Sequence, residues 1–275
     1  MKKSFIFSIS VLFTAVMLAG CASKPKSSNQ KTSERKVVVF SKGYSRNLVD
    51  TVTVATEKKS AFEKASAESP VTIKPYYIAQ KETSYERWNE VYSWAKENGY
   101  TFANEGVEGK NGAVTMISWR DAVVWCNAAS EKDGLEPVYK NGGKVLKIAD
   151  TVKEGEGKAE NAIADIAATG YRLPTELEWE FAARGGNPEG NDWLYPSNPA
   201  DSANSYGMYN MCGGVWELCA DSWATNNNRK AILGGSDKTP DKAVVTSKDF
   251  VPVTRTYEDV GFRVVKAVIF TADAK

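Results

Sequence analysis

The chain has 275 residues, of which 42% are hydrophobic and 25% charged, a composition typical of a globular protein with a sizeable core. Its 35 basic and 34 acidic residues nearly cancel, which argues against a surface built to bind nucleic acid. Because the sequence contains no histidine, it excludes histidine metal sites, imidazole acid–base catalysis and nucleophiles that are paired with histidine.

The first twenty residues have the pattern of an export signal. Two lysines precede a short apolar run, residues 5–17, so residues 1–20 are interpreted as a signal peptide. The run that follows, Leu18–Cys21, resembles the bacterial lipobox, in which the cysteine becomes the lipidated first residue of the mature protein. This resemblance implies an exported protein that Cys21 anchors by lipid to the bacterial outer membrane, at the cell surface. The alternative is an ordinary cleaved signal peptide with an incidental cysteine.

The residues after the leader divide into a tether and a domain. Residues 22–35 are rich in serine and lysine and show no apolar periodicity, so they cannot bury enough surface to fold alone. Residues 21–35 are therefore predicted to be the lipidated cysteine and a flexible tether of about 20 Å. Residues 36–275 contain no internal repeat and are predicted to form one α+β domain.

Three segments of this domain carry the chemistry that starts a helix. In each, a capping side chain is followed three residues later by a carboxylate that can accept from the first backbone N–H groups. The three pairs are Thr83/Glu86, Ser118/Asp121 and Thr175/Glu178. Glycines at positions 99 and 134 are predicted to end the first two helices, and the third is predicted over 177–184.

Elsewhere the apolar pattern predicts strands. They are expected over residues 37–40, 71–78, 215–219, 231–233, 243–245 and 262–270. The stretches between them are long and rich in glycine, asparagine, aspartate and proline. Long loops in a compact domain often carry its function.

The run GYRLPTELEWEFAARGG, residues 170–186, resembles the signature of the formylglycine-generating, sulfatase-modifying family. The other blocks of that family occur in the expected order, at residues 77–83, 117–128, 209–217, 233–236 and 261–264. The resemblance therefore spans residues 70–267. It implies a C-type-lectin-like fold of the formylglycine-generating-enzyme type.

The resemblance also bears on catalysis. In active members of the family, two cysteines between the last two blocks bind copper(I), a metal that soft thiolates suit. Residues 237–260 of this chain contain no cysteine, so the resemblance implies a scaffold with neither catalytic residues nor a redox cofactor. The three cysteines of the domain, Cys126, Cys212 and Cys219, are interpreted as small buried side chains or as one disulfide and a thiol. An enzyme of the parent family with displaced catalytic groups is the alternative.

Segment 237–260 lies between two fixed blocks near the C-terminus, as does the variable region of diversity-generating-retroelement proteins. The chain is similar to the treponemal variable lipoproteins of that group, which implies a surface protein that binds an unknown protein or other surface ligand. Exposed aromatic residues among short polar ones suit such adaptable recognition, whereas in an ordinary loop they would pack into the core. The predicted ligand-binding positions are Asp237, Thr239, Asp241, Asp249, Phe250, Val251, Val253, Thr254, Thr256, Tyr257 and Asp259.

Residues outside this segment are predicted to be fixed. A protein that displays variation must keep its varying residues out of the core, so the flanking blocks should be buried. These blocks contribute Gly234, Gly235, Gly261, Phe262 and Arg263. Four tryptophans, Trp119, Trp179, Trp216 and Trp223, are interpreted as core aromatics.

One turn resembles a structural calcium site. Asn210, Gly213, Val215 and Glu217 match a calcium-binding turn of the family, in which side-chain and backbone oxygens surround the ion. The resemblance implies a structural Ca²⁺ at this turn. Alternatively, Asn210 and Glu217 form hydrogen bonds that stabilise the turn itself.

Overall fold

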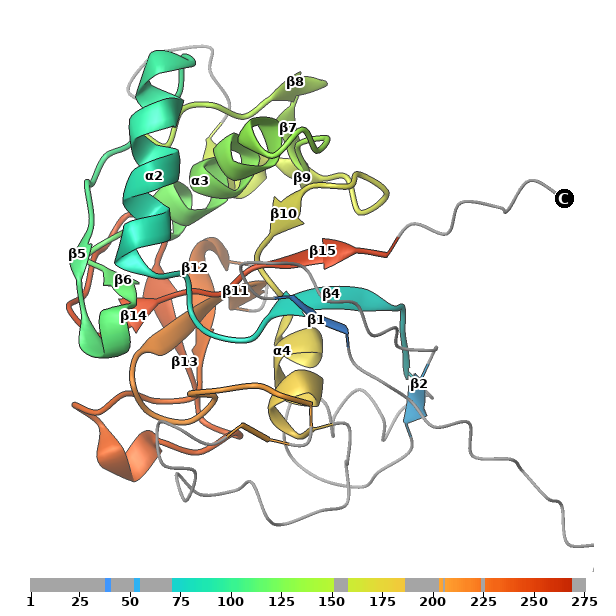
Figure 1. The fold of residues 1–275 in the computed structure, drawn as a ribbon, viewed down its shortest axis with the longest axis vertical. Coiled ribbons are helices and arrows are strands. Elements are labelled where there is room, and N and C mark those ends of the chain that lie inside the picture. Colours follow the sequence, from blue (N-terminus) through green and yellow to red (C-terminus); the bar gives the residue numbers. More distant parts are fainter. Residues whose placement is uncertain are drawn as a thin grey trace, which may run out of the picture. The chain divides into compact units, whose positions relative to one another are not determined.

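The computed structural model describes residues 71–150, 158–185, 203–204, 206–223 and 226–268, together with the short strands at 38–40 and 52–54. The predicted leader, the lipidated Cys21 and the tether lie outside the described residues. All the described residues belong to one unit, Arg35–Lys275, in which helices and strands are mixed (Figure 1). None of the helices in these ranges has the length and apolar character needed to cross a membrane.

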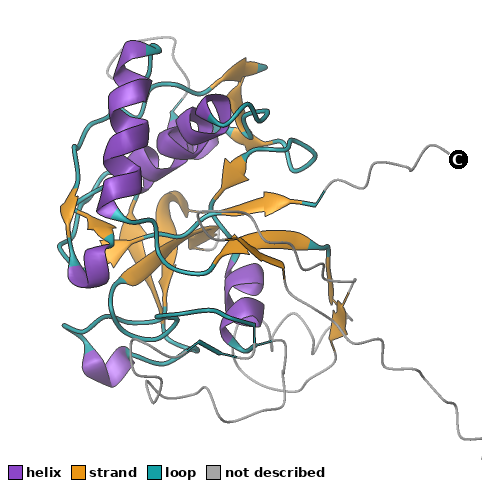
Figure 2. Ribbon diagram, in the orientation of Figure 1, coloured by secondary structure: helices purple, strands orange, loops and turns teal. Residues whose placement is uncertain are grey.

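Three α-helices begin at the predicted capping pairs or within one residue of them (Figure 2). They are α2 (Tyr85–Glu97), α3 (Trp119–Lys132) and α4 (Glu176–Ala183), and α2 packs against α3. The capping boxes at Ser118/Asp121 and Thr175/Glu178 are confirmed, since in each the cap side chain and the carboxylate accept from each other's backbone N–H. Helices α3 and α4 therefore begin where purely local hydrogen bonding dictates.

The start of α2 differs from its prediction by one residue. Ser84, not Thr83, caps the helix and accepts from the backbone N–H of Arg87 at 3.1 Å. Thr83 is kept extended because its N–H donates to the carbonyl of Phe262 and its carbonyl accepts from Val114. Its backbone is thus held by two distant segments before the helix can begin.

The two largest sheets in the described residues have four strands each (Figure 1). The first has the order β1 (Val38–Phe40), β4 (Tyr76–Ala79), β15 (Val265–Ala267) and β10 (Tyr171–Arg172). The second has the order β13 (Lys248–Pro252), β12 (Asn226–Leu233), β11 (Trp216–Trp223) and β14 (Val260–Gly261). The pairs β1/β4 and β11/β14 are parallel, and all the other pairs in the two sheets are antiparallel.

Shorter elements complete the described chain. Small ladders are formed by β2 (Val52–Val54) with β3 (Val71–Ile73), by β5 (Val107–Glu108) with β6 (Val114–Thr115), and by β7 (Tyr139–Asn141) with β8 (Lys144–Val145) and β9 (Ile163–Ala164). Single 3₁₀ turns occur at η1 (Lys110–Gly112), η2 (Ala159–Asn161) and η3 (Pro240–Lys242).

Several strand predictions require correction. The predicted strand at 243–245 is wrong: Ala243 and Val245 are buried, but in a turn region that follows η3. The predicted run 71–78 is divided into β3 and β4, and Phe262 lies between β14 and β15 rather than inside one long strand. Strand β13 was not predicted at all. In each case apolar residues mark burial, and distant pairing partners decide which of them form strands.

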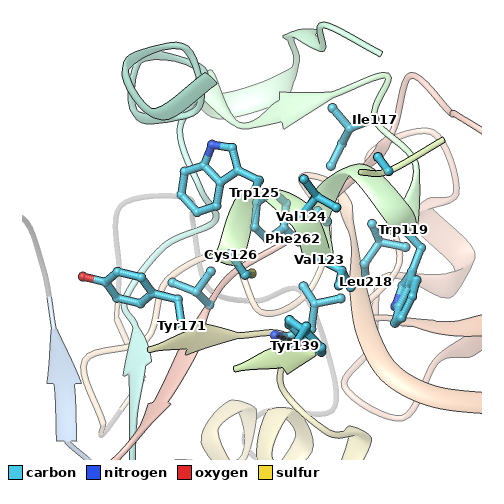
Figure 3. Close-up of a cluster of buried hydrophobic side chains, with 14 of the residues drawn as sticks. Ile117, Trp119, Val123, Val124, Trp125, Cys126, Tyr139, Tyr171, Leu218 and Phe262 are labelled. Carbon is cyan, nitrogen blue, oxygen red and sulfur yellow. Dashed lines mark hydrogen bonds between the residues drawn. The ribbon is translucent and has the colours of Figure 1, made fainter. Parts of the chain in front are cut away.

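Among the described residues, the buried apolar side chains form two hydrophobic clusters. In the larger one, the rings of Trp88 and Trp125 stack with centroids 5.9 Å apart, and Phe262 packs edge-on against both. Figure 3 shows Trp125, Phe262 and the buried Cys126 of this cluster. The smaller cluster includes Trp179 of α4 and Ile78 of β4. All five flanking-block residues are buried, as predicted, and so are three of the four tryptophans.

Candidate functional site

The candidate site is the segment 237–260, which leaves and rejoins the second sheet. In the chain it follows Gly234 and Gly235, whose positive φ angles of 91° and 73° favour glycine. A Cβ atom on Gly235 would lie 2.2 Å from the carbonyl oxygen of Lys242, so only glycine allows this close approach. The segment then passes through η3, returns to the sheet as β13 and ends in β14. Both of its ends are therefore fixed to the scaffold.

Two of the predicted ligand-binding residues lie in the core instead. Val251 is 7% exposed and Val253 is 3% exposed, and both belong to the larger hydrophobic cluster. Their placement at the binding face follows from interpreting segment 237–260 as a variable region, and no strand is predicted over residues 248–252. Strand β13 alternates its side chains, so Val251 packs against the larger cluster while Phe250 packs against the smaller one. The prediction that these two valines contact a ligand is wrong for this geometry.

Three other predicted positions form hydrogen bonds or ion pairs with the scaffold, and two of them, Thr239 and Asp259, meet in one network around the buried Ser236. The Ser236 hydroxyl donates to Asp259 Oδ2 at 2.6 Å and lies 3.1 Å from the Thr239 hydroxyl, which also accepts from the indole N–H of Trp216. Asp237 accepts from the backbone N–H of Gly214 at 2.9 Å and forms an ion pair with Lys110. These contacts hold the segment to the scaffold.

The remaining predicted positions have solvent-facing surface. Asp241, Asp249 and Thr254 are exposed, whereas Phe250, Thr256 and Tyr257 are half-buried. Neither aromatic ring is fully buried, although both contact the core clusters. The segment therefore divides into core residues, residues that form anchoring hydrogen bonds, and residues that face solvent.

Trp223 was predicted to be a core residue, but it is 51% exposed. Its ring stacks on Phe250 with centroids 6.1 Å apart, and the guanidinium of Arg229 lies 5.0 Å from its centroid. The ammonium of Lys248 lies 5.4 Å from the Phe250 ring. We call Trp223, Arg229, Lys248 and Phe250 the aromatic–cation patch.

The signal that could have revealed this patch lies in the polar residues around Trp223. Strand β11 is buried from Trp216 to Cys219 and then becomes progressively exposed towards its end. Asp221 and Ser222 precede Trp223, and the polar run Asn226–Asn228 opens the next strand. A tryptophan at such a polar strand end is better placed at the surface than in the core.

The predicted calcium turn does not have the contacts of a cation site. Arg263 donates to both oxygens of Glu217 at 2.5 Å, and the indole N–H of Trp179 adds a third hydrogen bond at 2.7 Å. The side-chain amide nitrogen of Asn210 donates one hydrogen bond to Glu82 Oε2, at 3.0 Å. No group of three or more Cys, Asp or Glu side chains suited to a metal occurs among the described residues. The Glu217 carboxylate is committed to a guanidinium, so these residues do not fit a bound Ca²⁺.

The cysteines of the described chain offer no thiolate pair. Cys126, Cys212 and Cys219 are all free, and two of them are fully buried. Burial, with a smaller contribution from Glu217, raises the pKa of Cys212 to about 12, so this group is a neutral thiol near pH 7. A buried neutral thiol behaves as a small apolar side chain.

Comparison with known proteins gives consistent matches. The family described as sulfatase-modifying factor enzyme 1-like domain matches residues 23–203 and 195–268. The chain is 31% identical over 231 residues to the chaperone protein LppX of Paenibacillus barcinonensis, covering 83% of this chain and 71% of that protein.

Two solved structures share the fold. The crystal structure of CarF has a TM-score of 0.66 at 28% identity and covers 81% of this chain and 97% of that one. Treponema denticola variable protein 1 has a TM-score of 0.57 at 24% identity and covers 80% and 94% of the two chains. These matches confirm the predicted α+β, formylglycine-generating-enzyme type of fold.

Proposed function

Because this chain belongs to the sulfatase-modifying factor enzyme 1-like family, we propose that it is an exported, non-catalytic member that presents a variable ligand-binding face. The observation that carries the proposal is the division of segment 237–260 between anchoring and solvent-facing residues. Substitution of the solvent-facing residues leaves the contacts of the anchoring residues in place, and a scaffold that displays variable residues requires this separation. A structure of the same fold is described as a variable protein, and we extend that description to this chain.

The chemistry of the exposed residues suits binding of a protein or another surface ligand. The aromatic–cation patch offers two stacked rings flanked by positive charges, and tryptophan and arginine are enriched among the residues that dominate binding energy. Asp241, Asp249 and Thr254 add short polar side chains that can vary without repacking the core.

Natural variation in the gene tests this proposal. We expect substitutions to concentrate at six solvent-facing codons, while the codons of the core residues Val251, Val253 and Phe262 stay constant, because changes there would disrupt packing. The six are Asp241, Asp249, Phe250, Thr254, Thr256 and Tyr257. Deep sequencing of natural populations measures this pattern. In addition, the neighbouring DNA should contain a near-copy of the coding sequence for segment 237–260 that is rich in asparagine codons, beside a reverse transcriptase gene. Substitutions spread evenly over core and surface codons would contradict the proposal.

The chain should not convert a sulfatase-type cysteine peptide to formylglycine. Residues 237–260 contain no cysteine, and of the three free thiols in the described residues Cys126 and Cys219 are buried while Cys212 is half-buried. Incubation of the protein with copper(I), oxygen and such a peptide, followed by mass spectrometry of the peptide, checks this. An active family enzyme serves as the positive control. Turnover above the protein-free control would favour the alternative, an enzyme with displaced catalytic groups.

The proposed membrane anchor is Cys21, which lies outside the described residues. We propose that the mature chain begins at Cys21 and carries more than one acyl chain, since a single chain anchors only marginally. Mass spectrometry of the protein extracted from membranes should find a lipid-modified N-terminal peptide, and Cys21→Ala should shift the protein out of the membrane fraction. An unmodified Cys21, or a mature start elsewhere, argues against the anchor.

A further inference from the structure

Strand β13 is the last strand of the second sheet, so one of its two edges has no neighbouring strand among the described residues. Hydrogen bonds from Gly234 N to Ser247 O and from Val253 N to Asn228 O continue its ladder with β12 at both ends. Because an antiparallel ladder alternates, the main-chain groups of the odd-numbered residues of β13 face β12, and those of residues 248, 250 and 252 face the free edge. A free edge of this kind is a surface on which another chain can add a strand.

The free edge is closed at Phe250 by two side chains. Arg229 Nη2 donates to the carbonyl oxygen of Phe250 at 2.5 Å, and the N–H of Phe250 donates to Asp249 Oδ1 at 2.7 Å. Arg229 lies on β12, outside segment 237–260. Since its hydrogen bond ends on the main chain, it does not depend on the side chain that residue 250 carries.

The edge is also closed at Pro252. Proline has no N–H to offer to a new strand, and the carbonyl of Pro252 accepts from the backbone N–H of Arg255 at 3.1 Å. Proline on an edge strand is one of the devices that keep such strands from pairing. From Phe250 to Pro252, each outward main-chain group is therefore either missing or bonded within the chain.

The side chains of β13, in contrast, suit pairing with a second copy of the same strand. A two-fold axis at Phe250 would place this residue opposite its own copy and Lys248 opposite residue 252. No like charges face each other in this register, because Asp249 lies opposite Val251. Two aromatic rings that face each other across a strand pair stabilise it. The main chain thus forbids an association that the side chains favour.

We propose that Arg229 and Pro252 close the free edge of β13 and so prevent it from pairing with β13 of a second copy. Neither residue is among the predicted variable positions. The edge therefore stays closed when substitution at position 249 or 250 changes the displayed side chains. This purpose rests on the proposed display function, whereas the closure itself rests on the main-chain contacts.

Reopening the edge tests the proposal. Arg229→Met removes the donor and keeps a long side chain beside Trp223, and Pro252→Val restores the missing N–H. Sedimentation equilibrium of the full chain, carrying Cys21→Ala to remove the proposed anchor, measures self-association. In the double variant it should strengthen about tenfold or more, because the two-fold axis uses each restored hydrogen bond twice. Arg255→Met, an equivalent change at an exposed arginine that keeps the backbone N–H, should associate as the parent does.

A third substitution identifies the surface through which the copies meet. Phe250→Lys in the double variant places two ammonium groups opposite each other, so association should return to the parent level. Phe250→Ser in the otherwise unchanged chain should leave association at the parent level, because Arg229 still holds the main-chain carbonyl.

Two outcomes overturn the proposal. One is a double variant that associates no more strongly than the parent, and the other is association that persists with Phe250→Lys, since the copies would then meet elsewhere. Thermal midpoints establish that each variant is folded. If Arg229→Met does not fold, Pro252→Val combined with Asp249→Ala opens the edge from the other side and is judged in the same way. The variation of the gene tests the display function separately, so either proposal can fail without the other.

Discussion

Replacing Phe262 with alanine should lower the free energy of unfolding by about 3 to 5 kcal/mol or prevent folding altogether. The ring is fully buried and packs edge-on against Trp88 at 6.1 Å and Trp125 at 5.4 Å. Its removal leaves a cavity among rigid aromatic neighbours that cannot collapse to fill it. For a unit of this size, the thermal midpoint should fall by roughly 6 to 20 °C.

The matched control for this variant is a change on the exposed part of the segment. Thr254→Ser and Asp249→Ser should each alter the free energy of unfolding by no more than about 0.5 kcal/mol, because both side chains face solvent. Thermal or denaturant unfolding measures all three variants under the same conditions. If Phe262→Ala unfolds like the two serine variants, the position is not the core anchor that the structure indicates.

Removing the charge of Glu217 should cost about 3 to 5 kcal/mol, because it leaves the fully buried Arg263 without its counter-ion. Glu217→Gln keeps the size of the side chain and can still accept from the indole of Trp179, so the loss reports on charge. Part of the cost is offset by Glu82, whose carboxylate lies 4.0 Å from Arg263.

The double variant Glu217→Gln/Arg263→Met separates charge from packing. Because it removes both buried charges, it should be more stable than Glu217→Gln alone, although Arg263 also donates to the carbonyls of Ala79, Gln80 and Tyr209. Denaturant unfolding of both single variants and the double variant completes the cycle. If the losses in the free energy of unfolding are additive, the two side chains do not interact strongly, which would contradict a stabilising buried ion pair between Glu217 and Arg263.

The hydrogen bonds of the Glu217 pair also explain why a calcium site could not be judged from sequence. Asn210 and Glu217 are close in the chain and have the right chemistry for the ion. Arg263, 46 residues further on, occupies the carboxylate. Only the folded chain brings that guanidinium to Glu217, and a carboxylate that balances a buried arginine is not available to a cation.

Features that depend on neighbouring residues, or on motifs in a fixed order along the chain, can be predicted from the sequence alone. The capping boxes of α3 and α4 are local hydrogen bonds across three residues, so they were predictable residue by residue. The fold class and the burial of the flanking blocks, Gly234 to Gly235 and Gly261 to Arg263, were also predicted correctly.

The exposure of individual residues in segment 237–260 depends on long-range contacts in the folded chain. Its β13 strand exists because β12 provides a partner, and the backbone of Val253 is held by Asn228 and by Arg120 at the start of α3. These contacts direct the side chains of Val251 and Val253 into the core, and they place the ring of Phe250 beside that of Trp223. Strand pairing and burial depend on partners far away in the chain. A local sequence pattern shows which side chains are apolar but does not show which distant segment they will pair with.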